Sequence, residues 1–338
     1  MTSLPDLRHF MGTLSLKKAA NASVLLHSYF RSRLTGDPRI PAWPFTISVE
    51  PTTHCNLRCP ECPSGLRSFS RATGRIELPL FKKIIDEMQD HLIFLYFYFQ
   101  GEPFLHPQFS DMIRYASARG VYTVTSTNGH YLNDDRAKET VESGLSRIII
   151  SVDGTTQESY AQYRKGGRLD IVLEGALRLA HWKRKLQSHA PHIIFQMIVF
   201  RHNEKETEEF RHLAKAFGAD EVLLKTAQIY NADNAGKMLP EKEKFSRYVF
   251  SGNRLMLKHP LHNRCWKLWH SSVITWDGKV VPCCFDKDAR YVMGDLTNQS
   301  FREVWNSAPY LQFRRKLLHS RQTIDICSNC SEGALVWA

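Results

Sequence analysis

Three cysteines lie close together in "HCNLRCPEC", residues 54–62: Cys55, Cys59 and Cys62. Deprotonated thiols of this kind bind soft metals and iron–sulfur clusters. Structural zinc sites and ordinary iron–sulfur sites take four protein ligands, so three thiols on one loop leave one position open. A cubane [4Fe–4S] cluster bound in this way keeps one iron free to chelate a small molecule. The alternative is a zinc site in which His54 supplies the fourth ligand.

A second group of five cysteines lies near the C-terminus. Its first two members follow a Cx12Gx4C pattern around Gly278, and a Cx2C pair closes the group. Four thiolates are the ligand set of a closed zinc site or of a complete iron–sulfur cluster, and both interpretations stay open at this point. The five are Cys265, Cys283, Cys284, Cys327 and Cys330.

Polar residues stand at the ends of several short apolar runs. They occur in "FQGEP" (99–103), "STNG" (126–129), "SVDG" (151–154) and "YRKGG" (163–167). Taken singly, a Glu or Ser in such a place caps a turn more often than it binds a ligand. The first three of these motifs come at the ends of predicted strands, on the edge of the sheet where such folds carry their chemistry.

The pattern that must position these residues alternates strand and helix from about residue 46 to 225. The strands are short, apolar and rich in β-branched and aromatic residues, as in a parallel sheet covered by helices. Six such units are too few for a closed eight-stranded barrel, so the sequence predicts an α/β fold with a partial, open (β/α)6 barrel and chemistry on the loops after the strands. The predicted strands are 46–50, 93–99, 121–126, 147–152, 193–199 and 221–225. The predicted helices are 79–91, 107–119, 133–143, 170–186 and 204–217.

The flanking segments differ from this pattern. Residues 13–34 predict an amphipathic helix that ends before Gly36, and we expect it to pack on the neighbouring domain rather than on a membrane. A helical stretch is predicted near 241–258, followed by a hairpin over 271–284 and short helices. We therefore divide the chain into an N-terminal helix and linker (1–45), a barrel (46–235), and a linker helix with a small α+β cysteine-rich domain (236–338).

Composition sets limits on the class of protein. The chain has 338 residues, of which 43% are hydrophobic and 23% charged, as in globular proteins. It has no apolar run long enough for a membrane span and no signal-peptide core, so we expect a cytoplasmic protein whose cysteines bind metal. The formal charge of +11 falls once seven thiolates bind metal, and the basic residues are scattered. A solvated surface explains them, and nucleic acid is not the expected partner.

Cx3Cx2C after the first strand, followed by these motifs in this order, resembles the radical S-adenosylmethionine (SAM) superfamily. The resemblance implies a [4Fe–4S] cluster whose open iron binds SAM, and reductive cleavage of SAM to a 5′-deoxyadenosyl radical. It implies that Glu102 holds the SAM ammonium and that Gly101 lets the backbone approach the ligand. Asn128 and Ser151 would contact SAM, and Arg164 would bind its carboxylate. It also implies a flavodoxin- or ferredoxin-type electron donor.

One departure concerns adenine. Many relatives place an aromatic residue before the third cysteine, where this chain has Glu61. We therefore expect that adenine is held in another way, through the backbone around Met197 to Val199.

The second cysteine group resembles the SPASM/twitch domains of the same superfamily. This implies one auxiliary [4Fe–4S] cluster ligated by four of the five cysteines, with Cys284 left over. Cys284 is then a small buried hydrophobe, or it acts as the proton acceptor that an aspartate provides in sulfatase-maturing relatives. Nearby Asp286 is the other candidate for that role. A thiol beside a cluster can also bind the metal or contact the substrate, which is the remaining alternative for Cys284. The predicted cluster ligands are Cys265, Cys283, Cys327 and Cys330.

The resemblance indicates the first half of the reaction better than the second. The radical abstracts hydrogen from a substrate C–H bond, and an auxiliary cluster can accept the second electron of an oxidation. We expect oxidative modification of a peptide or protein, with dehydrogenation of a sugar, polyol or aminocyclitol as the alternative. A non-catalytic electron carrier or RNA-binding iron–sulfur protein is the third hypothesis, and it leaves the SAM motifs unexplained.

Overall fold

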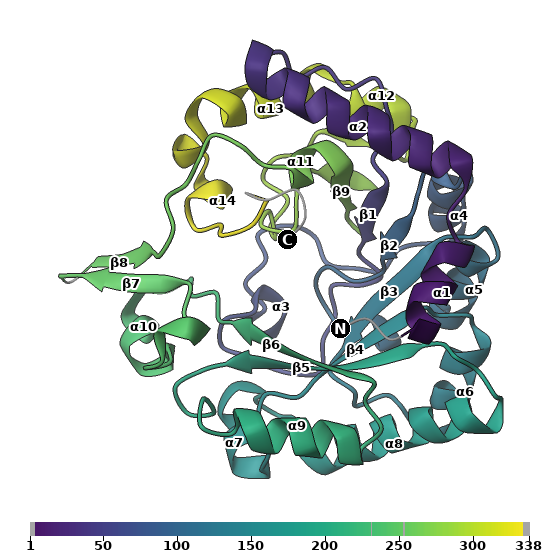
Figure 1. Cartoon of the computed structure of the whole chain (residues 1–338), viewed down its shortest axis with the longest axis vertical. Helices are drawn as coiled ribbons and strands as arrows, with labels where there is room; N and C mark the ends of the chain where they lie inside the picture. The colour runs from purple at the N-terminus through teal and green to yellow at the C-terminus, as the bar shows by residue number, and fades with distance from the viewer. Residues whose placement is uncertain (1–3, 231, 253, 334–338) are drawn as a thin grey trace.

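One curved, mostly parallel sheet organises the molecule (Figure 1). The computed structural model describes residues 4–230, 232–252 and 254–333. Six parallel strands pair in chain order, and the predicted (β/α)6 arrangement is confirmed. These strands are β1 (Thr46–Val49), β2 (Phe94–Tyr96), β3 (Tyr122–Thr127), β4 (Arg147–Ser151), β5 (His192–Val199) and β6 (Glu221–Thr226).

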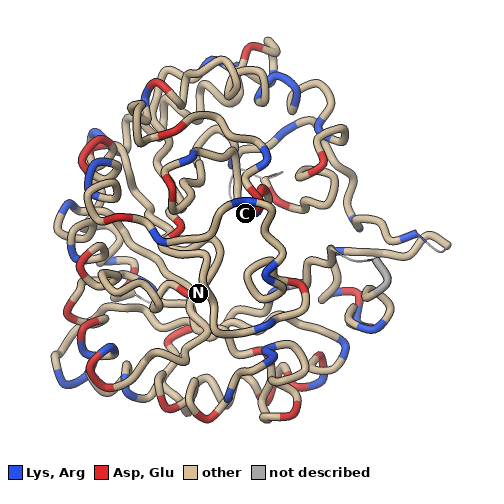
Figure 2. The backbone as a smooth tube through the Cα atoms, turned by 180° about the vertical axis from the view of Figure 1, so that it is seen from behind, with Lys and Arg blue, Asp and Glu red and all other residues tan. Residues whose placement is uncertain are grey.

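Amphipathic helices lie on the outside of the curve (Figure 1). Their apolar faces are buried against the strands, and Figure 2 shows basic and acidic residues interspersed around the outside of the molecule. These helices are α4 (Leu78–Met88), α5 (Phe109–Ser117), α6 (Asp134–Glu142), α8 (Leu169–Lys185) and α9 (Thr207–Ala216). Short segments between them are α3 (Pro63–Leu66), η1 (Pro103–Leu105) and α7 (Gln157–Tyr163).

The predicted C-terminal hairpin is confirmed, and it continues the barrel sheet. Strand β9 (Ser271–Ile274) pairs in parallel with β1, and β10 (Lys279–Val281) returns antiparallel to β9. Gly278 takes a φ of +84° in the turn, a conformation that favours glycine. The short β11 (Gly294–Asp295) completes a nine-stranded sheet, so the cysteine-rich domain and the barrel share one frame.

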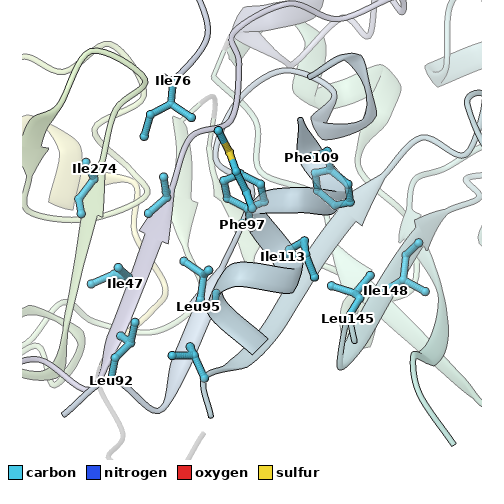
Figure 3. Close-up of a cluster of buried hydrophobic side chains, with 14 of the residues drawn as sticks. Ile47, Ile76, Leu92, Leu95, Phe97, Phe109, Ile113, Leu145, Ile148 and Ile274 are labelled. Carbon is cyan, nitrogen blue, oxygen red and sulfur yellow. The ribbon is translucent and has the colours of Figure 1, made fainter. Parts of the chain in front are cut away.

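The core is continuous across this junction. Ile47 of β1, Leu95 of β2 and Ile274 of β9 are fully buried in one cluster (Figure 3). Four further helical segments cover the C-terminal strands: α11 (Lys267–His270), α12 (Phe301–Trp305), α13 (Ala308–Ser320) and α14 (Asp325–Ser328), with η3 (Arg321–Thr323) between the last two.

The predicted helix near 241–258 is wrong. After α10 (Ala232–Met238) and η2 (Glu243–Phe245), strands β7 (Tyr248–Ser251) and β8 (Arg254–Leu257) form a separate antiparallel hairpin. Aromatic and aliphatic residues favour strands here, and Gly252 provides the turn with a φ of +58°.

The N-terminal segment packs on the protein, as the sequence predicts. Helix α2 (Leu16–Thr35) starts at the capping side chain of Ser15 and ends at Gly36, where φ is +72°. Tyr29 of α2 packs against Trp266 and Trp269 of the C-terminal domain.

A further helix, α1 (Leu4–Gly12), was not predicted. Its buried Asp6 pairs with Arg147 and accepts a hydrogen bond from Tyr122, at the first residues of β4 and β3. Helix α1 therefore covers the end of the barrel away from the cysteine loop.

Candidate functional site

The three-cysteine loop lies at the carboxyl end of β1, the edge where such sheets carry their chemistry. Helix α3 begins directly after Cys62 and packs on the loop. Gly65 makes this contact possible, because a Cβ there would lie 2.5 Å from the backbone nitrogen of Cys59. The backbone N–H of Arg58 also donates to the carbonyl of Lys165, 2.9 Å away. The loop is therefore held from two sides.

The three thiols of this loop are near enough to influence one another electrostatically. Burial raises the pKa of Cys55 to about 12, and neighbouring Glu102, Cys62 and Cys59 push it in the same direction. Burial also raises the pKa of Cys59, although Arg164 acts against it. A cluster can bind only thiolates, so loading must release protons from these buried thiols. The side chain of His54 is exposed, unlike the buried thiol of Cys59.

Glu102 is a buried carboxylate held by neutral donors. It accepts hydrogen bonds from the Thr127 hydroxyl at 2.7 Å and from the backbone N–H groups of Asn128 at 2.8 Å and Phe104 at 3.2 Å. Burial raises its pKa and Arg164 acts against this, but the described ion pair of Arg164 is with Asp153 and not with Glu102. A carboxylate buried without a counter-ion is suited to bind a cationic ligand.

Gly101 brings the backbone of this motif against the cysteine loop. It has a φ of +74°, and a Cβ would lie 2.2 Å from the Thr52 carbonyl oxygen. The neighbouring Gln100 is buried, and its Oε1 has no hydrogen-bond partner among the described residues. At this point of the site the backbone is closely packed, and the side-chain oxygen of Gln100 is a hydrogen-bond acceptor that has no donor among the described residues.

Asn128, at the end of β3, joins this cluster. Its Nδ2 donates to Asn56 Oδ1 at 2.8 Å and lies 3.9 Å from Cys55 Sγ. Ser151 ends β4 and pairs in register with Gln196 of β5, farther along the sheet. The structure thus brings Asn128 to the cysteine loop, while the SAM contact of Ser151 stays a prediction.

Arg164 reaches the loop with a partner that sequence reasoning missed. Its Nε donates to Asp153 at 2.5 Å, and it is one of the groups that act on the Cys59 thiol. The other oxygen of Asp153 accepts from the backbone N–H of Ile198 at 2.6 Å. The motif "SVDG" contained this signal, because the carboxylate follows the end of β4 directly.

Glu61 turns toward the segment after β6. Its carboxylate accepts from the Tyr230 backbone N–H and from Asn234 Nδ2, each at 2.9 Å. It therefore fixes the chain that leads into α10. The adenine contact around Met197 to Val199 stays a prediction.

Four cysteines of the second set are buried or half-buried neighbours. Burial raises the pKa of Cys327 to about 11 and that of Cys330 to about 12, and Cys265 adds to both shifts. Cys283 is a further neighbour of Cys265 and Cys330, and burial raises its pKa as well. Arg321, which was not predicted, is buried among these thiols.

Two candidate proton acceptors have different surroundings. Cys284 is exposed, so the interpretation of a small buried hydrophobe is wrong. Asp286 is buried, and its two oxygens accept from the backbone N–H groups of Arg290 and Tyr291, each at 2.8 Å. Asp286 therefore holds the loop after β10, and its role as a proton acceptor stays a prediction.

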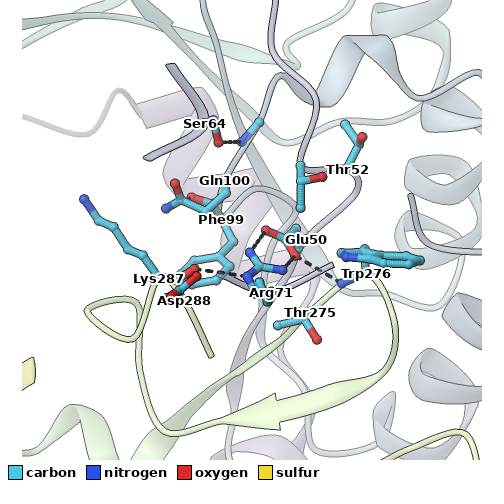
Figure 4. A network of polar contacts seen from close by, with 12 residues as sticks. Glu50, Thr52, Ser64, Arg71, Phe99, Gln100, Thr275, Trp276, Lys287 and Asp288 are labelled. Carbon is cyan, nitrogen blue, oxygen red and sulfur yellow. Dashed lines mark hydrogen bonds and ion pairs between the residues drawn. The ribbon is translucent and has the colours of Figure 1, made fainter. Parts of the chain in front are cut away.

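A polar network fixes this loop to the barrel (Figure 4). Arg71 donates to both oxygens of buried Glu50, at 2.8 and 2.6 Å, and its Nε donates to the Lys287 carbonyl. The backbone N–H of Trp276 also donates to Glu50. The network joins the segment after the cysteine loop to the hairpin of the C-terminal domain.

A cavity of about 370 Å³ lies beside this network. Glu61 and Pro63, on either side of the third cysteine of the loop, line it. Phe285, which follows the exposed cysteine, and Asn329, between the last two cysteines of the chain, line it as well. The cavity is therefore bounded by segments that carry both cysteine sets.

Comparison with protein families agrees with this arrangement. Residues 49–214 match the radical SAM superfamily, and residues 265–331 match SPASM, an iron–sulfur cluster-binding domain. The chain belongs to the radical SAM superfamily. It is a radical SAM enzyme with a SPASM domain. Its cofactors are SAM and a [4Fe–4S] cluster, and its SPASM domain binds auxiliary iron–sulfur clusters.

Two curated relatives align with most of this radical SAM enzyme. The tungsten-containing aldehyde ferredoxin oxidoreductase cofactor-modifying protein of Pyrococcus furiosus is 26% identical over 324 residues, 84% of this chain and 86% of its own. The mycofactocin maturase MftC of Mycobacterium ulcerans is also 26% identical, over 85% of this chain and 80% of its own.

Solved structures share the fold. SuiB of Streptococcus suis bound to S-adenosylmethionine superposes with a TM-score of 0.61 at 12% identity, over 80% of this chain and 68% of its own. BtrN in complex with AdoMet and 2-DOIA gives a TM-score of 0.52 at 19% identity, over 85% of this chain and 93% of its own. No helix of the described residues is long and apolar enough to cross a membrane.

The residues of this radical SAM enzyme fit the cofactors. The thiols stand as neighbours in a set of three and a set of four, which is the donor chemistry of two clusters. A buried carboxylate with no ion pair among the described residues, Glu102, and the closely approaching backbone of Gly101 lie beside the set of three.

Proposed function

We propose that this radical SAM enzyme is a maturase that oxidatively modifies a peptide or protein substrate by abstracting hydrogen from a C–H bond. The observation that carries the proposal is the cavity bounded by both cysteine sets. A substrate in this cavity would lie beside the site of hydrogen abstraction and beside an acceptor for the second electron.

Each cofactor has a proposed set of protein groups. Cys55, Cys59 and Cys62 hold the first cluster, and Glu102 and Asn128 orient SAM on it. When bound, this cluster and SAM supply the 5′-deoxyadenosyl radical. One auxiliary [4Fe–4S] cluster is held by the four remaining buried or half-buried thiols, those of Cys265, Cys283, Cys327 and Cys330.

The cavity also offers a specific contact to the substrate. Lys287 lines it, and its Nζ lies 4.2 Å from the centre of the Tyr230 ring. No described carboxylate forms an ion pair with Lys287, whereas Arg290, another lining cation, pairs with Asp288 and Asp325. Figure 4 shows the Lys287 side chain pointing away from the Glu50–Arg71 network. We infer that Lys287 pairs with an anionic group of the substrate.

Relatives support a peptide substrate. They include mycofactocin maturases and the subtilosin biosynthesis protein AlbA of Bacillus subtilis, which is 25% identical over 285 residues. A structure of SuiB was solved with its precursor peptide SuiA.

A small cyclic molecule is the second candidate. BtrN, solved with 2-DOIA, is matched over 93% of its own length. A cavity of about 370 Å³ also lies within the range typical of small-molecule sites.

Deuterium transfer separates the two candidates. The reconstituted enzyme is incubated with SAM, dithionite and deuterated candidate substrates, and 5′-deoxyadenosine is analysed by mass spectrometry. We expect deuterium to be transferred from a peptide. Transfer from a deuterated cyclitol or sugar but from none of the peptides would contradict the proposal.

We also propose a cytoplasmic setting and a flavodoxin- or ferredoxin-type electron donor. All eight cysteines are free thiols, which suits a reducing compartment.

A further inference from the structure

The side chain of Arg321 is buried beside the second cysteine set without a carboxylate partner. It is 2% exposed, and no described Asp or Glu forms an ion pair with it. A buried charge without compensation is costly, so an opposite charge is expected beside it in the working protein.

The groups that surround the guanidinium are thiols and carbonyls. Its Nη2 donates to Cys330 Sγ at 3.4 Å and to the Glu332 carbonyl at 2.8 Å, and its Nη1 donates to the Arg264 carbonyl at 2.7 Å. Cys265 and Cys327 are further electrostatic neighbours. The Glu332 carboxylate is already paired with Lys267, so the thiolates of a bound cluster are the available counter-charge.

We propose that Arg321 raises the reduction potential of the auxiliary cluster, and this rests on the proposed ligand set. Reduction adds one electron to the cluster, and no bond forms or breaks. The electron comes from the substrate radical in turnover and from dithionite in a titration. A permanent positive charge and a hydrogen bond at a ligand sulfur both favour the more negative, reduced form. Arg321 is thus a positioning residue for the electron-accepting step.

A purely structural role is the competing explanation, because Arg321 also ties together the backbone at residues 264 and 332. Arg321→Gln keeps hydrogen-bond donors and removes the charge, whereas Arg321→Lys keeps the charge. Arg314→Gln is the matched control. Arg314 is a fully buried arginine of the same domain, but it is stacked between Trp305 and Tyr310.

The test is an EPR-monitored redox titration of full-length protein in which Cys55, Cys59 and Cys62 are replaced by Ala, so that only the auxiliary cluster remains. We expect Arg321→Gln to lower the midpoint potential clearly, Arg321→Lys to shift it less, and Arg314→Gln to leave it unchanged. Loss of iron from Arg321→Gln but not from Arg321→Lys would also support a requirement for the charge.

Two results would overturn the inference: an unchanged midpoint in Arg321→Gln, or loss of iron from both Arg321 variants. A background protein that binds no iron before Arg321 is changed would instead contradict the proposed ligand set.

Discussion

The cysteine loop after β1 and the cysteine set of the SPASM domain differ in the charge buried beside their thiols. The loop has a carboxylate, Glu102, whose hydrogen-bond donors are neutral, while its buried guanidinium, Arg164, is already paired with Asp153. The SPASM set has a guanidinium, Arg321, with thiols around it. The carboxylate Glu102 favours a cationic ligand beside a cluster that keeps one iron without a protein ligand. The guanidinium of Arg321 compensates the charge of thiolates around a cluster whose irons all have protein ligands. Similar thiol chemistry is thereby directed to two tasks.

Removing each set separately should break the enzyme in two different ways. Replacing Cys55, Cys59 and Cys62 by Ala should reduce SAM cleavage to background, because no cluster remains to deliver the electron. Replacing the four SPASM cysteines by Ala should keep SAM cleavage and abolish product. The measurements are 5′-deoxyadenosine, product mass and iron, with about eight irons per chain in the parent and about four in each variant. SAM cleavage retained by the first variant would contradict the assignment.

Alkylation should separate Cys284 from the other thiols. Cys284 is exposed, whereas ligated thiols are protected by the metal. In loaded protein, iodoacetamide should modify Cys284 and spare the other seven cysteines, and in cluster-free unfolded protein it should modify all eight. Peptide mass spectrometry gives the result. Protection of Cys284 together with modification of one proposed ligand would change the ligand set.

Glu102→Gln should weaken SAM binding and leave cluster loading intact. A hydrogen bond to a charged group contributes about 1.5–3 kcal/mol, so the dissociation constant should rise roughly 10- to 100-fold. Calorimetry with SAM measures this effect. The control is Asp6→Asn, which removes a buried carboxylate at the other end of the barrel. It should lower the melting temperature without changing SAM affinity. Equal losses of SAM affinity in both variants would show a general effect of destabilisation.

The pH dependence of stability should differ between cluster-free and loaded protein. Burial raises the pKa of Cys55 and of Cys330 to about 12. Because thiols titrate near pH 8.5 in an unfolded chain, the stabilising effect of the protonated form is complete below about that pH and is lost above it. Between about pH 7.5 and 9.5, urea denaturation should show a loss of roughly 1 kcal/mol per buried thiol without clusters. Loaded protein should show a smaller loss, and an equal loss in both forms would contradict cluster binding by these thiols.

The strand order and the strand-end motifs could be predicted because both depend on local patterns. Apolar runs define the strands, and Glu102 and Asn128 follow the ends of β2 and β3, which a parallel sheet brings to one edge. The pairing of β9 with β1 could not be predicted in this way, because it joins segments far apart in the chain.

Side-chain contacts that depend on tertiary packing could also not be predicted from the sequence. Asp153 is a partner of Arg164 because α7 returns the chain to the carboxyl end of β4, and Arg321 reaches the thiols through the packing of α13 and η3. Residues 248–257 were mistaken for helix because short apolar runs do not separate helix from strand by periodicity alone.

EPR spectroscopy of two variants, each keeping one cysteine set, tests the central comparison most directly. Each variant is loaded, reduced and measured with and without SAM. SAM should change the signal of the variant that keeps Cys55, Cys59 and Cys62, and leave the signal of the variant that keeps the SPASM set unchanged. A SAM-dependent change in the SPASM-only variant, or none in the other, would contradict the division of tasks.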